Sequence, residues 1–298
     1  MMDPGWILPE PSAVTVGVFD GVHRGHARLI GQVVGQARAR DLAAGVLTFD
    51  PHPVEVLAPE KAPLLLTTLE RRVELLMALD VDWVGVLDLG QIRMMSPEQF
   101  VTDVLVGRAA SRLVAVGEDF RFGHDRAGDV SVLTRAGERH GFEVTAVDLV
   151  ADGSGIISSS RIRAQIAAGR VDEAADLLGR AHRVSGPVIS GEARGRTLDY
   201  PTANLACPAG LAMPADGIYA VRVGDLQGVA SLGVRPTFGE GGTRLLEVHL
   251  FDFDGDLYGK VLDIDFIQHL RGEERFDSVE DLVAQMARDA AAARSALT

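Results

Sequence analysis

Residues 13–30 read AVTVGVFDGVHRGHARLI, and this stretch decides the fold of the first half of the chain. Residues 13–19 form a short apolar run rich in Val, as is typical of a buried strand. From His26 onward, apolar side chains recur at helical spacing through Ala37. Gly17 near the end of the strand, with Gly21 and Gly25 in the loop that follows, lets the backbone approach a ligand closely. The stretch therefore predicts a strand, a tight loop and a helix, the opening of an α/β fold.

The same alternation continues along the first half of the chain. Apolar runs predict further strands at residues 45–49, 83–87, 113–117 and 143–147. Helical periodicity lies between them, at residues 69–79, 97–106 and 131–139, and two short helices follow at 159–168 and 172–178. Such alternation predicts a doubly wound parallel sheet with helices on both faces.

After Gly179 the pattern changes to strands without intervening helices. The expected strands lie at residues 183–189, 218–223, 228–232, 245–251 and 260–266, separated by Gly, Pro and Asp. This predicts an antiparallel β-barrel or sandwich. A helix is expected at 278–296, with Ser278 as its N-cap and acidic residues in its first turn. With 298 residues, two domains are expected, at 1–180 and 181–298.

The composition is that of a folded protein without polyanionic partners. The chain is 47% hydrophobic and 24% charged, and its net charge is −13, which argues against disorder and against binding to nucleic acid or anionic membranes. Cys207 is the only cysteine, so an intramolecular disulfide and a cysteine metal cluster are excluded. The first residues lack a basic signal-peptide start. We therefore expect a cytoplasmic protein, and the charge neither requires nor rules out a homo-oligomer.

Two segments of the first half carry phosphate chemistry. His23 and His26 flank Gly25 where the helix begins, and helix N-termini with nearby imidazoles bind anions and stabilise developing charge. A glycine-rich turn with two solvated histidines is the alternative. Residues 157–163 (ISSSRIR) place two serines and two arginines at another helix start. They predict either a second phosphate clamp or an ordinary capped surface helix.

A third segment, residues 195–205 (GRTLDYPTANL), suggests a metal site. Thr202 and Asn204 would face the same way in an extended chain. Hydroxyl and amide oxygens suit Mg²⁺, which is held mostly by phosphates and water. A turn rich in Thr, Pro and Asn is the alternative.

The first-half motifs resemble those of a known family. Residues 19–26 (FDGVHRGH) resemble the HxGH signature of nucleotidyltransferases, and specifically that of bacterial bifunctional riboflavin kinase/FAD synthetases. Residues 48–53 (TFDPHP), 117–129 (GEDFRFGHDRAGD) and 157–163 are similar to further motifs of that family. The resemblance implies transfer of AMP from ATP to FMN, with release of pyrophosphate. It implies ATP contacts by His23, His26, Gly17, Phe19, Gly25, Ser159, Ser160, Arg161 and Arg163, and flavin contacts by Asp50, His52 and Asp119.

The second half resembles the riboflavin kinases of the same family. The similar segments are residues 195–205, 233–239 (GVRPTFG), 247–259 (EVHLFDFDGDLYG) and 270–279 (LRGEERFDSV). The resemblance implies that Glu247 is the general base that activates riboflavin towards ATP. It also implies Mg²⁺ ligation by Thr202 and Asn204, a nucleotide-covering loop with Gly195 and Arg196, and an approach of Arg271 to the flavin.

Taken together, the motifs predict an α/β plus β protein. A doubly wound, Rossmann-like nucleotidyltransferase domain is followed by an antiparallel β-barrel kinase domain with a C-terminal helix. Three residues depart from the family pattern: Ser160 replaces Thr, Asp119 replaces an Asn found in some members, and Asp199 replaces a common Gly. Asp199 would repel ATP phosphates if it faced them. The alternatives are therefore an adenylyltransferase with a weakened or silent kinase domain, a nucleotidyltransferase for another substrate, or a flavin-binding protein without catalysis.

Overall fold

The computed structural model describes residues 6–8, 10–189, 200–235 and 243–298. Contacts divide the chain into two compact units, Met1–Ser159 and Ser160–Thr298. No helix in the described residues is long and apolar enough to cross a membrane.

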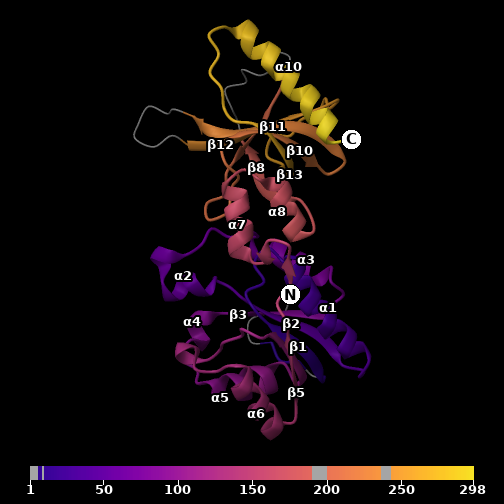
Figure 1. Cartoon of the computed structure of the whole chain (residues 1–298), viewed down its shortest axis with the longest axis vertical. Coiled ribbons are helices and arrows are strands. Elements are labelled where there is room, and N and C mark those ends of the chain that lie inside the picture. Colours follow the sequence, from indigo (N-terminus) through magenta and orange to yellow (C-terminus); the bar gives the residue numbers. More distant parts are fainter. Residues whose placement is uncertain (1–5, 9, 190–199, 236–242) are drawn as a thin grey trace. The chain divides into compact units, whose positions relative to one another are not determined.

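A parallel sheet of five strands forms the centre of the first unit (Figure 1). Its strands are β1 (Ser12–Val16), β2 (Ala43–Phe49), β3 (Trp83–Leu87), β4 (Ser111–Gly117) and β5 (Glu143–Val147). They lie in the order β3-β2-β1-β4-β5, with every neighbouring pair parallel. The chain therefore builds the sheet outward from β1 in both directions, which confirms the predicted doubly wound fold.

Helices cover both faces of this sheet, as predicted. Ile30 of α1 (Arg24–Arg38) and Leu76 of α3 (Leu69–Met77) share an apolar cluster with Val46 of β2. On the other face, η2 (Phe100–Arg108) and α6 (Val130–His140) pack on β1 and β4. Shorter elements complete the unit: α2 (Pro53–Leu57), η1 (Pro59–Lys61), α4 (Leu89–Ile92), α5 (Pro97–Gln99), η3 (His124–Arg126), β6 (Ala151–Asp152) and β7 (Gly155–Ile156).

Two predicted elements differ from the structure. Strand β1 ends at Val16, three residues early, because the chain turns sharply and Phe19 adopts a φ of 51°. The helix expected at residues 97–106 is a short α-helix, α5, followed by the π-helical segment η2.

A closed antiparallel barrel forms most of the second unit (Figure 1). Its strands are β8 (His182–Ile189), β9 (Ala203–Ala206), β10 (Gly217–Val223), β11 (Leu226–Arg235), β12 (Thr243–Leu250) and β13 (Val261–Arg271). They close in the order β10-β11-β12-β9-β8-β13. The barrel alternative is therefore confirmed, whereas strand β9 was not predicted.

Within the part of the second unit that the structure describes, three helices accompany the barrel. Helices α7 (Ser159–Ala167) and α8 (Val171–Leu178) precede it, and α8 packs against β13 and β8. The domain boundary expected at residue 180 stays a prediction. Helix α10 (Val279–Ala296) packs on the outside of the barrel through Ala293, which shares an apolar cluster with Ala220 and Phe251. Ser278 caps α10 as expected, accepting a hydrogen bond from the backbone N–H of Asp281.

Candidate functional site

His23 is the N-cap of helix α1. Its Nδ1 accepts a hydrogen bond from the backbone N–H of His26 at 3.3 Å. Because Nδ1 is the acceptor, the proton of the neutral ring resides on Nε2. The cap therefore fixes the orientation of the His23 ring, with Nε2 as its hydrogen-bond donor.

The two histidines of the predicted phosphate site lie face to face. The ring centroids of His23 and His26 are 3.5 Å apart, and the Phe19 ring packs edge-on against His26 at 5.1 Å. Phe19 is only 2% exposed, so its side chain supports His26 from the core. A Cβ at Gly25 would lie 3.1 Å from the His23 ring, and one at Gly17 would lie 2.8 Å from the Phe19 ring. Both glycines therefore make room for this ring stack.

Asp20 fixes the loop that carries the histidines. Its buried carboxylate accepts hydrogen bonds from the backbone N–H groups of Leu66 and Thr67 and from the Thr67 hydroxyl. The Ser159 hydroxyl donates to the Asp20 carbonyl at 2.9 Å. Ser159, predicted as a phosphate ligand, thus ties the end of the first unit to this loop. A hydroxyl has one proton to donate, so a bond from Ser159 to phosphate would replace this one.

The other predicted ligands of the first unit follow the carboxyl ends of strands. The histidine loop follows β1 and the exposed Asp119 follows β4, and the strand order reverses between these two strands. Such a switch point is where open α/β sheets bind ligands. Asp50 and His52 follow β2, and His52 caps α2 by accepting from the Val54 backbone N–H at 3.2 Å. Burial raises the pKa of the Asp50 carboxyl.

Ser160, Arg161 and Arg163 lie at the start of helix α7, in the second unit. Ser160 is exposed and the two arginines are half-buried. Their expected position opposite the histidine pair stays a prediction.

In the second unit, barrel register brings the predicted kinase residues together. Leu246 and Val248 of β12 point into the barrel core, so Glu247 points outward. Glu247 pairs directly with Asn204 of β9 on one side and with Ser231 of β11 on the other. The three polar side chains therefore form one row across the outer face of the barrel.

The Asn204 side chain is suited to a cation. It is 7% exposed, and its Oδ1 has no hydrogen-bond partner among the described residues. An unpaired buried acceptor is costly unless a ligand satisfies it. Thr202 lies two residues earlier, where the chain enters β9. This orphaned oxygen beside a hydroxyl fits the predicted Mg²⁺ site.

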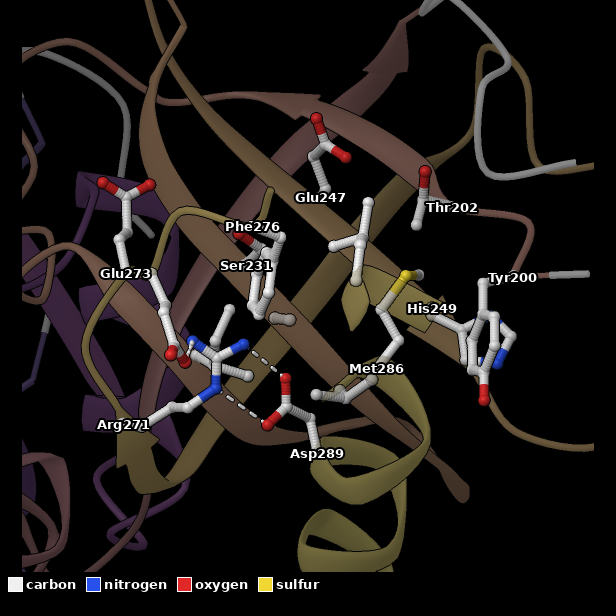
Figure 2. A pocket seen from close by; sticks show the side chains of 15 residues that line it. Tyr200, Thr202, Ser231, Glu247, His249, Arg271, Glu273, Phe276, Met286 and Asp289 are labelled. Atoms are coloured by element: carbon white, nitrogen blue, oxygen red, sulfur yellow. Dashed lines mark hydrogen bonds and ion pairs between the residues drawn. The ribbon is translucent and has the colours of Figure 1, made fainter. Parts of the chain in front are cut away.

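A cavity of about 270 Å³ lies beside the polar row (Figure 2). Its polar lining includes Thr202, Ser231 and Glu247, and its apolar wall includes Phe276 and Met286. The lining also includes Tyr200, Ile218, Val229, Ala230, His249, Arg271, Glu273, Glu274, Leu282 and Asp289. Polar groups gathered at one side of a mostly apolar cavity are typical of a small-molecule site.

Arg271 lines this cavity, and its guanidinium is already engaged; its predicted approach to the flavin stays a prediction. Its Nε and Nη2 donate to the two carboxylate oxygens of Asp289 at 2.9 and 2.7 Å (Figure 2). Asp289 is 7% exposed and also accepts from the Gln285 amide. The Asp289 carboxylate raises the pKa of Arg271. This forked pair joins strand β13 to helix α10 and forms part of the cavity wall.

Thr202 lines a second cavity as well, of about 220 Å³, on the side of Pro201, Phe253 and Tyr258. The His249 ring holds the chain entering this region, because its Nδ1 donates to the Pro201 carbonyl at 2.9 Å. The two cavities thus share the wall formed by Thr202. Gly195, Arg196 and Asp199 lie outside the described residues.

The sequence analysis missed several residues at these sites, including Ser231, His249 and Asp289. His249 stands two residues after Glu247 on the same strand, and this spacing could have placed it on the same face. Asp289 gave no comparable signal, since an Asp on a helix usually faces solvent. Its position became evident only from its pairing with Arg271.

Family models match both halves of the chain. The FAD synthetase model matches residues 7–161 and the riboflavin kinase model matches residues 178–297. The chain is 38% identical to the bifunctional riboflavin kinase/FMN adenylyltransferase of Escherichia coli K12, over 96% of this chain and 92% of that protein. It is 40% identical to the protein of the same name from Pseudomonas fluorescens, over 94% and 91% of the two chains.

A solved structure has the same fold over most of its length. It is described as a macrolide-efflux protein from Streptococcus pneumoniae, and it is 33% identical with a TM-score of 0.87, covering 96% of this chain and 94% of that one. Both family models and the full-length relatives agree on one assignment. This chain belongs to the family of bifunctional riboflavin kinase/FMN adenylyltransferases.

Proposed function

We propose that this protein makes both flavin cofactors: it phosphorylates riboflavin to FMN with ATP, and it adenylylates FMN to FAD with ATP, releasing pyrophosphate. The observation that carries the proposal is the pairing of Glu247 with Asn204 beside a cavity in a chain whose other unit holds the stacked pair His23 and His26. The two constellations suit two different phosphorus transfers on the two units.

Adenylyl transfer is assigned to the first unit. A phosphate oxygen of FMN attacks the α-phosphorus of ATP, a new P–O bond forms, and the bond to pyrophosphate breaks. The FMN phosphate is already an anion, so the step needs no general base. The imidazole edges of His23 and His26 stabilise the negative charge that grows on the transferring group, and the N-terminus of α1 adds its partial positive charge. Ser160, Arg161 and Arg163 complete the hold on the phosphates.

Phosphoryl transfer to riboflavin is assigned to the barrel. The 5′-hydroxyl of riboflavin is a neutral alcohol, so it needs a base as it attacks the γ-phosphorus of ATP. Glu247 takes that proton, the new P–O bond forms, and ADP leaves. Its place on an outward face of β12, between Ser231 and Asn204, holds the carboxylate at the rim of the cavity.

Thr202 and Asn204 would hold Mg²⁺ in the kinase site. The support is the Asn204 Oδ1, which has no hydrogen-bond partner among the described residues, together with Thr202 two residues earlier, just before β9. When bound, the ion neutralises phosphate charge on ATP. The register of β9 and β12 places Asn204 directly opposite Glu247.

The two cavities suit the two substrates of the kinase step. The cavity with apolar walls near Phe276 and Met286 suits the flavin ring, with Arg271 and Asp289 at its border. The cavity near Tyr258 suits the nucleotide, whereas Gly195 and Arg196, which the family resemblance assigns to nucleotide binding, lie outside the described residues. Thr202 lines both cavities. The γ-phosphate would therefore pass beside Thr202 on its way from the nucleotide to riboflavin.

Three finer assignments complete the proposal. Residues 1–180 form the adenylyltransferase domain, and residues 181–298 form the kinase domain. In the first of these, Asp50, His52 and Asp119 lie on the flavin side of the site. The protein acts in the cytoplasm on small molecules, without a nucleic-acid or membrane partner.

A chromatographic time course tests the proposal. Purified protein is incubated with Mg-ATP and riboflavin, and in parallel with Mg-ATP and FMN. We expect FMN and then FAD in the first reaction and FAD in the second. FAD from added FMN alone would show a silent kinase domain and would implicate Asp199. Bound flavin without product in either reaction would overturn the enzymatic proposal in favour of a binding protein.

A further inference from the structure

Arg72 is a charged residue in the core of the first unit. It lies on helix α3 and is 0% exposed. Leu69, Val73 and Leu76 lie on the same helical face, and Leu76 is also fully buried. A lone arginine among apolar positions is unusual in a helix that packs on a sheet.

The Arg72 guanidinium bridges two loops of the adenylyl-transfer site. Its Nη1 donates to the Val18 carbonyl at 3.2 Å, in the loop that leads from β1 to the histidines. The same Nη1 donates to the Phe49 carbonyl at 2.8 Å, directly before Asp50, and to the Thr48 hydroxyl at 3.3 Å. Thr48 in turn donates to the Val18 carbonyl at 2.8 Å. One side chain therefore fixes the ends of β1 and β2 relative to each other.

Among the described residues, Arg72 forms no direct ion pair. Its Nε and Nη2 have no hydrogen-bond partner within the described residues. The carboxylates of Asp20, Asp50 and Glu70 favour its charged form, but burial is the stronger influence and lowers its pKa. The Asp20 carboxylate accepts hydrogen bonds from Leu66 and Thr67. A buried guanidinium that stays this poorly paired costs stability, which calls for a functional reason.

We propose that Arg72 is a positioning residue for adenylyl transfer. It fixes the His23 loop and the Asp50 loop relative to each other and places a buried positive charge beneath them. The inference rests on the proposed function of the first unit. Phosphate groups of ATP and FMN would lie beyond the carboxyl ends of β1 and β2, where a charge inside the protein is only weakly screened. The loop positions matter because small displacements of reacting groups lower the rate steeply.

Three variants separate this role from a purely structural one. Arg72→Met removes the charge and the forked donors at similar size, whereas Arg72→Lys keeps the charge and one donor group. Arg71→Met removes a charge from the next position, where Arg71 pairs with Glu74 at the surface, and serves as the matched control. Both tryptophans of the chain, Trp6 and Trp83, lie in the first unit with ring centroids 5.4 Å apart. Their fluorescence therefore reports on the folding of that unit alone.

The full-length proteins are assayed for kcat and KM in FAD formation from FMN and ATP, and for phosphorylation of riboflavin. We expect Arg72→Met to lower kcat/KM for FAD formation about 100-fold, with a folded tryptophan signal and unchanged riboflavin phosphorylation. The kcat/KM of Arg72→Lys should be at least about tenfold higher than that of Arg72→Met. Arg71→Met should match the wild type.

Each other outcome is decisive. Wild-type kcat and KM in a folded Arg72→Met protein would overturn the assignment while leaving the proposed function intact. If Arg72→Met does not fold, the Arg72→Lys variant decides. If its kcat/KM for FAD formation falls only in proportion to the fraction of protein that is unfolded under assay conditions, the positioning role is overturned. A wild-type protein that makes no FAD would overturn both this inference and the proposed function.

Discussion

Glu247 and Asn204 face each other across strands β12 and β9 on the outer face of the barrel. The Glu247 carboxylate lines a cavity, and the Oδ1 of the neighbouring Asn204 has no hydrogen-bond partner among the described residues. Carboxylates in such a position can serve as bases, and neutral amide oxygens can bind a hard cation without adding charge. The pairing gives the two residues separable roles, which substitution can test one at a time.

Replacing Glu247 with Gln should abolish the kinase step alone. The amide keeps the size and the hydrogen-bonding shape of the side chain but cannot take the riboflavin proton, so FMN formation should fall by a factor of about 100 to 10,000. FAD formation from added FMN should stay at the wild-type rate, because the substitution lies in the other unit. Both rates come from one chromatographic assay. Normal FMN formation by the variant would remove Glu247 as the base.

Replacing Asn204 with Ala should separate metal affinity from stability. The Mg²⁺ concentration that half-saturates riboflavin phosphorylation should rise by at least about tenfold. Even substitutions of residues that only hydrogen-bond to a metal ligand lower metal affinity by about this factor. The metal-free barrel should be at least as stable as before, because the orphaned acceptor is gone. Asn204→Asp, which keeps the oxygen, serves as the matched control. The stability of the metal-free protein is measured by thermal melting followed by circular dichroism. An unchanged Mg²⁺ requirement in the Ala variant would contradict the metal site.

The fold could be predicted where the apolar pattern alone decides it. Alternating strands and helices gave the parallel sheet, and the Ser278 cap gave the start of α10. Strand β9 was missed because ANLA lacks β-branched residues, and it is a strand because it pairs with β12 and β8. The early end of β1 was missed because Phe19 continues the apolar run. Its φ of 51° shows that the chain has left the extended conformation by that point.

The site could be predicted where a local motif carries it, and not where distant segments meet. Motifs located Glu247 and Asn204 separately, but only the barrel register makes them a pair. Arg72 interrupts the apolar face of a predicted helix, and that signal was available in the sequence. Asp289 could not be found in this way, because its partner Arg271 lies on a separate strand.

The cap formed by His23 leads to a prediction about stability. His23→Asn retains a side-chain oxygen that can accept the helix N–H, whereas His23→Ala does not. Both should slow FAD formation about 100-fold or more, since both lack the imidazole donor. Only the Ala variant should lose stability, by about 1 kcal/mol, in urea unfolding followed by tryptophan fluorescence. Equal stability of the two variants would show that the cap contributes little.

Asp50 should make the first unit less stable as the pH rises. Burial raises the pKa of its carboxyl from the ordinary value of 3.8, so the folded state binds more protons than the unfolded state just above that pH. The free energy of unfolding therefore falls as the pH rises through the interval between the two pKa values.

Replacing Asp50 with Asn removes this effect. The variant should be more stable than the wild type at pH 7, and its advantage should disappear below pH 3.8, when both are compared by urea unfolding. Asp125→Asn, at a side chain that is 88% exposed, is the control. A stability difference that does not change with pH would rule out ionisation of Asp50 as its cause.

The forked pair of Arg271 and Asp289 should hold helix α10 against the barrel and shape the flavin cavity. Asp289→Ala leaves the Arg271 guanidinium without its main partner in a largely buried place, and we expect a loss of roughly 2–4 kcal/mol in the unfolding free energy of the barrel. The KM for riboflavin should rise several-fold, with kcat changed less, because the pair lines the cavity while Glu247 is untouched. Asp252→Asn is the matched control, since Asp252 also binds an arginine of the α10 segment, Arg294, but is 80% exposed at its side chain. That variant should change neither quantity appreciably, because exposed ion pairs contribute little. Equal effects of the two substitutions would mean that α10 is held by its apolar contacts alone.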